Sequence, residues 1–430
     1  MSTTLTMNTI SFTIADVLSA VETPNGGYVV RVPSTGTRLV DHDAEGVALN
    51  VPGSNEDEYL DGGALADPTL RPGDALLFWR ASPGSHWTSD WPYPGATSGS
   101  RNQYCVPVVC VDYDPSEDAL CPPPVGRASN PLVRFGRMNP ITEANIDLNR
   151  LPRTFPLAKW EDQENSPLTP ELLANYVMPF AGEYVSGAWG TAGFTPGVGN
   201  GLYGRNYAEQ TSKALLYLCS DALDSEKMPV AIGVAQRGLA LAGAYMDGKQ
   251  DMANGGHFQG RTPLMIAAGV MLGIKQMSDP RWLGPRFWER HAFYEDGRSW
   301  WFDPNWTSLW QRTSDYRWGG HPAALDRPPA EWGNGHGSDK WAVTGYYVPT
   351  CGANLGSAIA MRLMNRETEI GRPFVSGILD QFMVGPPPHA LTELAVAGLS
   401  IPWGEEWAKP WTGLGIQRQA FDHLRERGLI

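Results

Sequence analysis

The hydrophobic period changes once along this chain, and that change constrains the fold most strongly. Up to about residue 125, apolar and polar residues alternate in short runs such as TISFTI and GGYVVRV. Alternation with a period of two predicts strands that bury one face. From Ser166 onward the apolar residues recur with the period of a helix, as in SPLTPELLANYVMPF and TPLMIAAGVMLGIKQM. We therefore predict a β-rich N-terminal part followed by a helical part.

A proline-rich segment separates the two parts. Residues 121–131 read CPPPVGRASNP, and consecutive prolines enter neither a helix nor a central strand. We expect a multidomain β + α protein. Its predicted units are a small β-sandwich or barrel-like domain over 1–125, a Pro-rich extended linker over 126–165 and a helical domain over 166–430.

The predicted helices indicate a layered arrangement. Thr169 is the expected N-cap of the first helix, with Pro170 and Glu171 in its first turn. Two later helices are expected at SEKMPVAIGVAQRGLALAGAYM and at TPLMIAAGVMLGIKQM. Both carry almost no charge, so we expect them to be buried on most faces. Long loops between helices argue against a four-helix bundle and favour an α/α-toroid-like domain or an array of α-hairpins. Residues 278–348 interrupt the helical pattern and are interpreted as a Trp-rich functional loop.

Charge and composition exclude several classes of function. A formal net charge of −13 argues against nucleic acid as a partner. The sequence contains no apolar run of the roughly 20 residues that a membrane span needs, so we expect no membrane insertion. Five scattered cysteines match no zinc or disulfide pattern, and we predict neither a metal nor a cofactor. The N-terminus shows no signal peptide, so we expect cytoplasmic synthesis.

Aromatic residues are the most informative excess. The chain has 17 Trp, nine of which lie between Trp282 and Trp341. A dense exposed group of Trp side chains suits the flat apolar face of a sugar ring. The alternative is that these side chains belong to the core.

One glycine-rich stretch, NGGHFQGR (254–261), leads directly into an apolar helix. Free N–H groups and the helix dipole favour an anion at such a helix N-terminus. His257 would provide a titratable group and Arg261 a bidentate anion clamp, with Gln259 between them. The alternative is that these side chains only cap the helix and tie down the loop.

Two further stretches offer candidate site residues. VGNGLYGRNYAEQ (198–210) also opens a helix with glycine turns, and RHAFYEDGRSWWFDPNW (290–306) is predicted to be a hairpin that presents rings. Packing tyrosines and a purely conformational Asp-Gly turn are the respective alternatives. The polar and aromatic candidates here are Tyr203, Arg205, Asn206, Tyr207, His291, Tyr294, Trp300, Trp301 and Asn305.

Three segments, YGRNYAEQTSKALLYL, NGGHFQGRTPLMIAAGVMLG and GYYVPTCGANLGSAIAMRLMN, resemble the helical core of α/α-toroid polysaccharide-processing proteins of the heparinase and alginate-lyase type. The resemblance covers roughly residues 170–385. It implies a cleft for polysaccharide in which a Tyr or His removes the proton next to a uronic carboxylate. An Asn, His or Arg neutralises that carboxylate.

The resemblance gives each candidate a role. The catalytic candidates are His257, Tyr203 and Asn206. The substrate-binding candidates are Arg261, Gln259, Arg205, Tyr207, His291, Tyr294, Trp300, Trp301 and Asn305.

This chain departs from that family in two ways, which lead to an alternative function. Its β part is small and comes first, and it shows no secretion signal. The alternative is a non-catalytic phage-type virion spike or fibre adhesin, attached to the particle through the β-domain and binding host capsule. A third class, an assembly protein without a ligand, predicts that the Trp-rich segment is buried.

Overall fold

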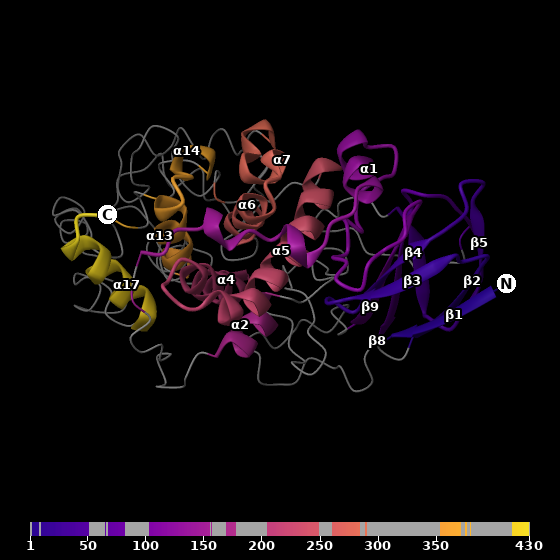
Figure 1. Cartoon of the computed structure of the whole chain (residues 1–430), viewed down its shortest axis with the longest axis horizontal. Coiled ribbons are helices and arrows are strands. Elements are labelled where there is room, and N and C mark those ends of the chain that lie inside the picture. The colour runs from indigo at the N-terminus through magenta and orange to yellow at the C-terminus, as the bar shows by residue number, and fades with distance from the viewer. Residues whose placement is uncertain are drawn as a thin grey trace, which may run out of the picture.

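The computed structural model describes residues 2–7, 10–50, 65, 68–81, 103–154, 156, 169–177, 204–248, 260–283, 289, 353–370, 375, 379 and 415–429. The described strands all lie between Ser2 and Val111, and the α-helices follow. In Figure 1 the strands form the end of the molecule that carries the N-terminus, and helix α17 (Gly415–Glu426) lies at the other end. The predicted order, a β-rich part followed by a helical part, is confirmed.

The strands form two sheets. The four-stranded sheet has the order β1 (Ser2–Met7), β2 (Ile10–Ala15), β5 (Thr37–His42) and β7 (Thr69–Leu70). The five-stranded sheet has the order β3 (Ser19–Thr23), β4 (Gly27–Arg31), β9 (Gln103–Val111), β8 (Ala75–Ala81) and β6 (Gly46–Leu49). The pairings are antiparallel except between β4 and β9, which run parallel.

The two sheets share one hydrophobic core. Along β2, buried residues alternate with half-buried ones, as its alternating sequence predicts. The Phe12 ring of β2 stacks on the Phe78 ring of β8, with centroids 4.5 Å apart. Because these rings come from different sheets, the sheets pack face to face as in a small sandwich.

Strand β9 is buried on both faces rather than one. Cys110 faces the core between the sheets, whereas Val109 and Val111 pack against Ala119 and Cys121 on the other face. The covering segment is fixed in turn by the helices, because the Cys121 amide donates to Gln236 Oε1 at 3.2 Å. The β-rich part therefore packs against the helical part through the chain that joins them.

The segment expected to be an extended linker contains helical structure. It includes α1 (Pro131–Met138) and the 3-10 helices η1 (Glu143–Asn145) and η2 (Leu148–Arg150). The physical reason is local: the Asn130 side chain accepts hydrogen bonds from the amides of Leu132 and Val133, which is a favoured N-cap before a proline at the first helical position.

A buried arginine in α1 joins several parts of the chain. Arg137 is fully buried. Its guanidinium donates to Asn50 Oδ1 at 2.8 Å, to the Gly126 carbonyl at 2.8 Å and to the Gly73 carbonyl at 3.2 Å. Since Asn50 and Gly73 belong to the β-rich part, this side chain fastens α1 to it.

The helical part contains six helices of at least eight residues among the described residues beyond α1. They are α2 (Pro170–Val177), α4 (Gly204–Leu218), α5 (Asp224–Met246), α6 (Arg261–Leu272), α13 (Leu355–Leu363) and α17. The predicted start of α2 is confirmed, because the Thr169 hydroxyl accepts from the Leu172 amide at 3.2 Å. Short turns complete the described part: α7 (Lys275–Ser278), η3 (Pro280–Leu283) and α14 (Glu367–Ile370).

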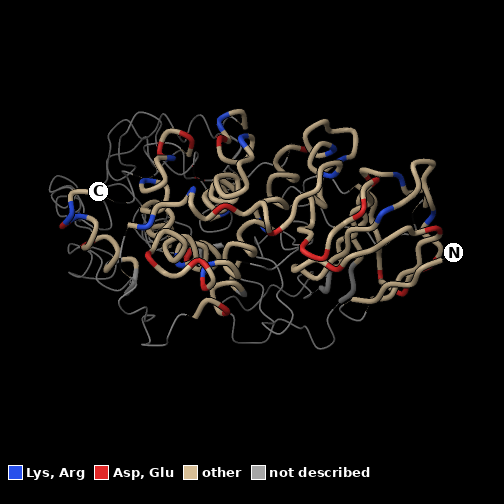
Figure 2. The backbone as a smooth tube through the Cα atoms, in the orientation of Figure 1, with Lys and Arg blue, Asp and Glu red and all other residues tan. Residues whose placement is uncertain are grey.

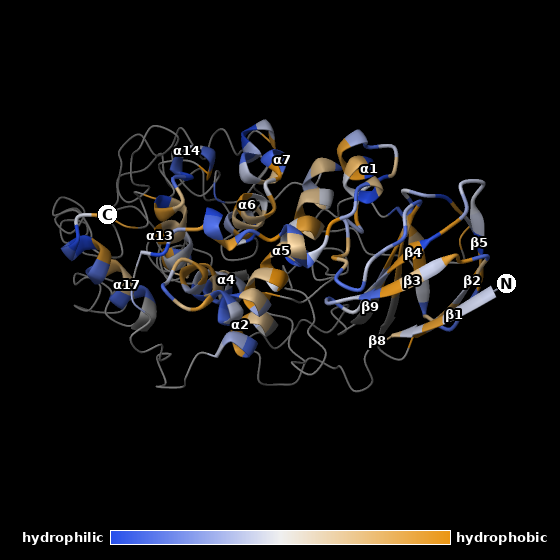
Figure 3. Cartoon of the chain, in the orientation of Figure 1, coloured by the Kyte–Doolittle hydropathy of each residue, from blue (hydrophilic) through white to orange (hydrophobic). Residues whose placement is uncertain are grey.

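Helices α5 and α6 lie at the centre of the helical core. Nearly every residue of α6 is buried, and Arg261 is its one charged residue. In Figure 3 the long helix α5 shows its apolar colouring over most of its length, and in Figure 2 α5 and α6 are largely free of charged residues. The predicted burial of these two helices on most faces is confirmed.

Gly273 divides a stretch that was expected to form one helix. It ends α6 with a left-handed φ of 70°, a conformation that glycine adopts readily at helix C-termini. The chain then folds back, so that a Cβ on Gly269 would lie 2.3 Å from the Ser278 amide. In the described part of the chain, no helix is long and apolar enough to span a membrane.

Candidate functional site

The starts of helices α4 and α6 lie against each other. A Cβ on Gly260, the N-cap of α6, would come within 2.6 Å of Ala208 Cα in the first turns of α4. Gly260 also has a φ of +80°, so only glycine suits this position. The two glycine-rich stretches that were predicted to open separate helices therefore end at the same place.

Tyr207 lies close to two buried arginines at this junction. The guanidinium carbon of Arg237, on α5, is 5.2 Å from the Tyr207 ring centroid, and that of Arg261, on α6, is 5.4 Å away. All three side chains are at most 2% exposed. Both cations are within the range of cation–π attraction, which strengthens when the groups are desolvated.

A buried carboxylate completes the junction. Glu289 is fully buried, and its Oε1 accepts a hydrogen bond of 3.0 Å from the Gly260 amide. A protein carboxylate thus occupies part of the anion-favouring N-terminus of α6. Arg237 and Arg261 contribute two positive charges and Glu289 one negative charge. Sequence reasoning missed Glu289, because a single Glu in an aromatic run carries no motif.

Helix α13, which lies next to α4, is held by hydrogen bonds to uncharged polar groups. The Ser212 hydroxyl donates to the Ala353 carbonyl at 2.7 Å and accepts from the Ser357 amide at 3.1 Å. The Gly356 amide donates to Gln417 Oε1 at 3.1 Å. These bonds satisfy first-turn N–H groups of α13, which otherwise have no partner within the helix, and fix α13 against both α4 and α17.

Two of the predicted site residues can be placed with their side chains. They are Tyr207 and Arg261, and the structure brings them together. Arg205 and Asn206 belong to the first turn of α4 and directly precede Tyr207, but their side chains are outside the described set. The remaining candidates lie outside the described residues: Tyr203, His257, Gln259, His291, Tyr294, Trp300, Trp301 and Asn305.

The described cysteines are poorly suited to nucleophilic chemistry. Cys110, Cys121 and Cys219 are free thiols and are buried. Burial raises the pKa of Cys121 and of Cys219 to about 12, so the thiolate is suppressed at neutral pH. Within the described ranges, no group of three or more His, Cys, Asp or Glu could hold a metal ion.

The charged groups of this junction are buried rather than exposed to solvent. With their guanidinium groups buried, Arg237 and Arg261 place positive charge beside Tyr207, where the starts of α4 and α6 meet. Comparison with protein-family models, with curated proteins and with solved structures finds no match for this chain.

Proposed function

We propose that this protein binds an acidic polysaccharide in its helical part, next to the joined starts of α4 and α6. The observation that carries the proposal is the pair of buried arginines whose guanidinium carbons lie 5.2 Å and 5.4 Å from the Tyr207 ring centroid. Among the described side chains of the junction, two guanidinium groups accompany the one carboxylate of Glu289, and we propose that they give this region a positive potential in a chain of net charge −13. That potential favours a ligand with carboxylate groups.

The proposed roles follow the position of each residue in the chain. Tyr203, Arg205 and Asn206 come just before or within the first turn of α4, and His257 and Gln259 come just before Gly260. These residues are the groups proposed to contact the sugar. Arg261 and Tyr207, both 1% exposed, act beneath it by positioning the two stretches and supplying charge.

We propose further that the helical part is an α/α toroid and that the Trp-rich segment lines its cleft. His291, Tyr294, Trp300, Trp301 and Asn305 belong to that segment. Rings along a cleft suit a polymer, because each ring covers the apolar face of one sugar. The likeness to heparinase and alginate-lyase type toroids supports this assignment through the motifs that open α4, α6 and α13.

Cleavage is proposed to follow a β-elimination. His257 or Tyr203 removes the proton next to the uronic carboxylate, while Asn206 hydrogen-bonds to that carboxylate and stabilises the negative charge that develops. The glycosidic C–O bond then breaks, a carbon–carbon double bond forms, and the departing oxygen takes up a proton. No redox partner is needed.

A second candidate, a non-catalytic adhesin that binds host capsule, is favoured by strand β1. Among the described strands β1 lies at the edge of its sheet, and its sequence STTLTM carries neither charge nor proline. Charged residues and prolines usually protect such edges from pairing with other chains. An unprotected edge suits attachment of the β-rich part to a larger particle.

One experiment separates these functions. Purified protein is incubated with alginate, hyaluronan, bacterial capsular polysaccharides and neutral dextran, while binding, chain length and ultraviolet absorbance of unsaturated ends are followed. Shortened chains with unsaturated ends support the lyase, provided that His257→Ala abolishes them. Binding without cleavage supports the adhesin, and absence of binding to every polysaccharide rejects both.

A further inference from the structure

Helix α1 distributes its side chains in the reverse of the usual order. Its inward face contains Val133 and the charged Arg137, both fully buried, whereas Phe135 is 65% exposed and Leu132 is 37% exposed. Leu132 and Phe135 are three residues apart, so they share one face of the helix. A surface helix normally turns its apolar side chains toward the core. The outward face of α1 therefore has the composition of a contact surface.

The charge around this face is positive. Arg134 is exposed on α1, and the side chain of Arg127, just before the helix, is 66% exposed. The helix itself carries no acidic residue. Arg127 lies 3.8 Å from the carboxylate of Asp247, whereas Arg134 forms no ion pair with any residue that the structure describes. The guanidinium of Arg134 is thus available to a partner.

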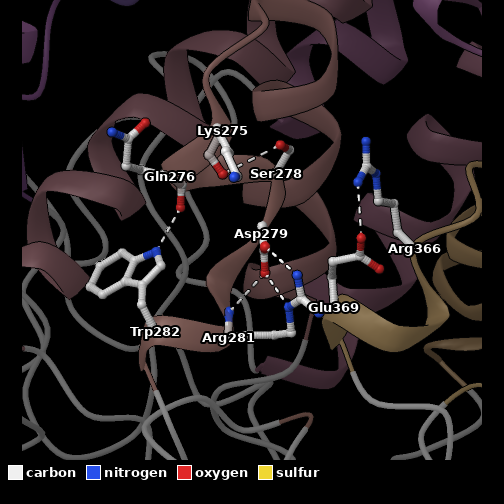
Figure 4. Close-up of polar contacts among 8 residues, drawn as sticks. All are labelled: Lys275, Gln276, Ser278, Asp279, Arg281, Trp282, Arg366 and Glu369. Carbon is white, nitrogen blue, oxygen red and sulfur yellow. Dashed lines mark hydrogen bonds and ion pairs between the residues drawn. The ribbon is translucent and has the colours of Figure 1, made fainter.

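Two arginines at the surface of the helical part provide a contrast. Arg281 contacts the Asp279 carboxylate at 2.6 Å, and Arg366 contacts the Glu369 carboxylate at 3.0 Å (Figure 4). Each of these guanidinium groups has an acidic neighbour within the same chain. At α1 the matching carboxylate has to come from another molecule.

A second surface of this chain has the complementary chemistry, and it begins at a bulge in β5. Val40 is 56% exposed. Thr13 of β2 pairs with Asp41, and the next residue, Ile14, pairs with Leu39. This shift leaves Val40 as the extra residue of a β-bulge, a feature that often directs a side chain away from the sheet.

Carboxylates follow the bulge. Asp41, Asp43 and Glu45 are all exposed, and Arg38 carries the one guanidinium in the sequence from residue 37 to residue 49. This surface therefore combines an exposed apolar residue with an excess of negative charge. In Figure 1, β5 lies toward the N-terminal end of the molecule and apart from α1, so one chain offers both surfaces at separate places.

We propose that the outward face of α1 binds the β5 bulge of a second copy of this chain, with Phe135 against Val40 and Arg134 beside the carboxylates of Asp41 and Glu45. Because the two surfaces differ, the association is head-to-tail and can extend to further copies. The net charge of −13 on each chain does not prevent it, since salt screens charges that are more than about 10 Å apart. The paired surfaces are small, so the association is weak and reversible.

Sedimentation velocity of the full chain over a range of concentrations tests this contact. The average mass should rise with concentration and should fall again at about 0.5 M salt, because exposed ion pairs are screened. Phe135→Ser should weaken association about tenfold, since aromatic anchors dominate such contacts. Leu223→Ser removes an apolar side chain that is 66% exposed and lies outside both surfaces, so it should have no effect.

A charge exchange identifies the two surfaces as partners. Arg134→Glu and Asp41→Arg should each weaken self-association at least about tenfold, because each brings like charges together. An equimolar mixture of the two variants should associate again. The Arg134→Glu protein keeps an intact β5 bulge, and the Asp41→Arg protein keeps an intact α1 face. Melting temperatures close to that of the wild type show that the variants are folded.

Three results would overturn the proposal. A wild type whose mass does not change with concentration would assign the α1 face to a different molecule. A mixture of Arg134→Glu and Asp41→Arg proteins that stays monomeric would show that the two surfaces do not meet. Equal effects of Leu223→Ser and Phe135→Ser would show that exposed apolar residues act nonspecifically.

Discussion

The guanidinium carbon of Arg261 lies 5.4 Å from the centroid of the Tyr207 ring, and both side chains are almost completely buried. Each residue follows its own glycine-rich stretch in the sequence, yet the fold places both at one junction of α4, α5 and α6. The proposed function depends on this junction, so mutations that weaken it should lower both stability and binding.

Replacing Tyr207 should reveal the attraction between its ring and the two arginines. Tyr207→Phe keeps the ring face and should change the free energy of unfolding little. Tyr207→Leu loses two desolvated cation–π contacts, which are worth about 2 kcal/mol each, as well as ring volume. Urea unfolding of both variants measures the difference. Equal stabilities for the Phe and Leu variants would show that the ring face contributes nothing.

Gly260→Ala should separate α4 from α6. The new Cβ would meet Ala208 Cα at 2.6 Å, and the residue would keep a φ of +80°. Overpacking and the unfavourable φ together should cost about 2–4 kcal/mol. The matched control is Gly248→Ala, with a φ of +107° and no atom within 4 Å of the new Cβ; it should cost only about 1 kcal/mol. Similar losses in both variants would contradict the close contact of the two helices.

Arg137→Met should loosen the attachment of α1 to the β-rich part. It removes the buried donors for the carbonyls of Gly73 and Gly126, while Asn50 Oδ1 loses one donor and keeps the Ala75 amide. We expect a loss of about 3 kcal/mol or more. Arg134→Met, on the same helix but exposed, should be close to neutral in the same denaturation experiment. A neutral Arg137→Met would show that these hydrogen bonds do not stabilise the fold.

Alkaline pH should destabilise the protein through its buried thiols. Burial raises the pKa of Cys219 from 9.0 to about 12. Between these values the unfolded chain loses the thiol proton and the folded chain keeps it, so stability should fall by about 1.4 kcal/mol per pH unit for this group. Cys219→Ala should show a correspondingly shallower decline across this window. Identical slopes for wild type and variant would argue against a strongly buried thiol.

Local patterns predicted much of the fold because their causes are local. The start of α2 follows from Thr169 and Pro170, and the strands follow from alternation. The break at Gly273 was missed because a single glycine is compatible with a continuing helix. The close packing of Ser278 against Gly269 determines that the helix ends at Gly273. That contact is tertiary and leaves no mark on the hydrophobic period.

The junction shows the same division between local and tertiary information. The anion preference of the α6 N-terminus could be predicted. The carboxylate of Glu289 that bonds there could not, because Glu289 lies far along the sequence and only the tertiary fold brings it to Gly260. Arg237 was likewise hidden in an apolar helix. Its structural role becomes clear only from its contact with Tyr207 in the folded protein.

The most direct test of the central claim is the affinity of Arg261→Lys for acidic polysaccharide, measured by titration calorimetry beside the melting temperature. Lysine keeps the charge but loses the planar guanidinium that faces Tyr207. We predict that the wild type binds an acidic polymer and not dextran, and that the variant binds it at least about tenfold more weakly while remaining folded. Equal affinity of the two proteins, or no binding by the wild type, would contradict it.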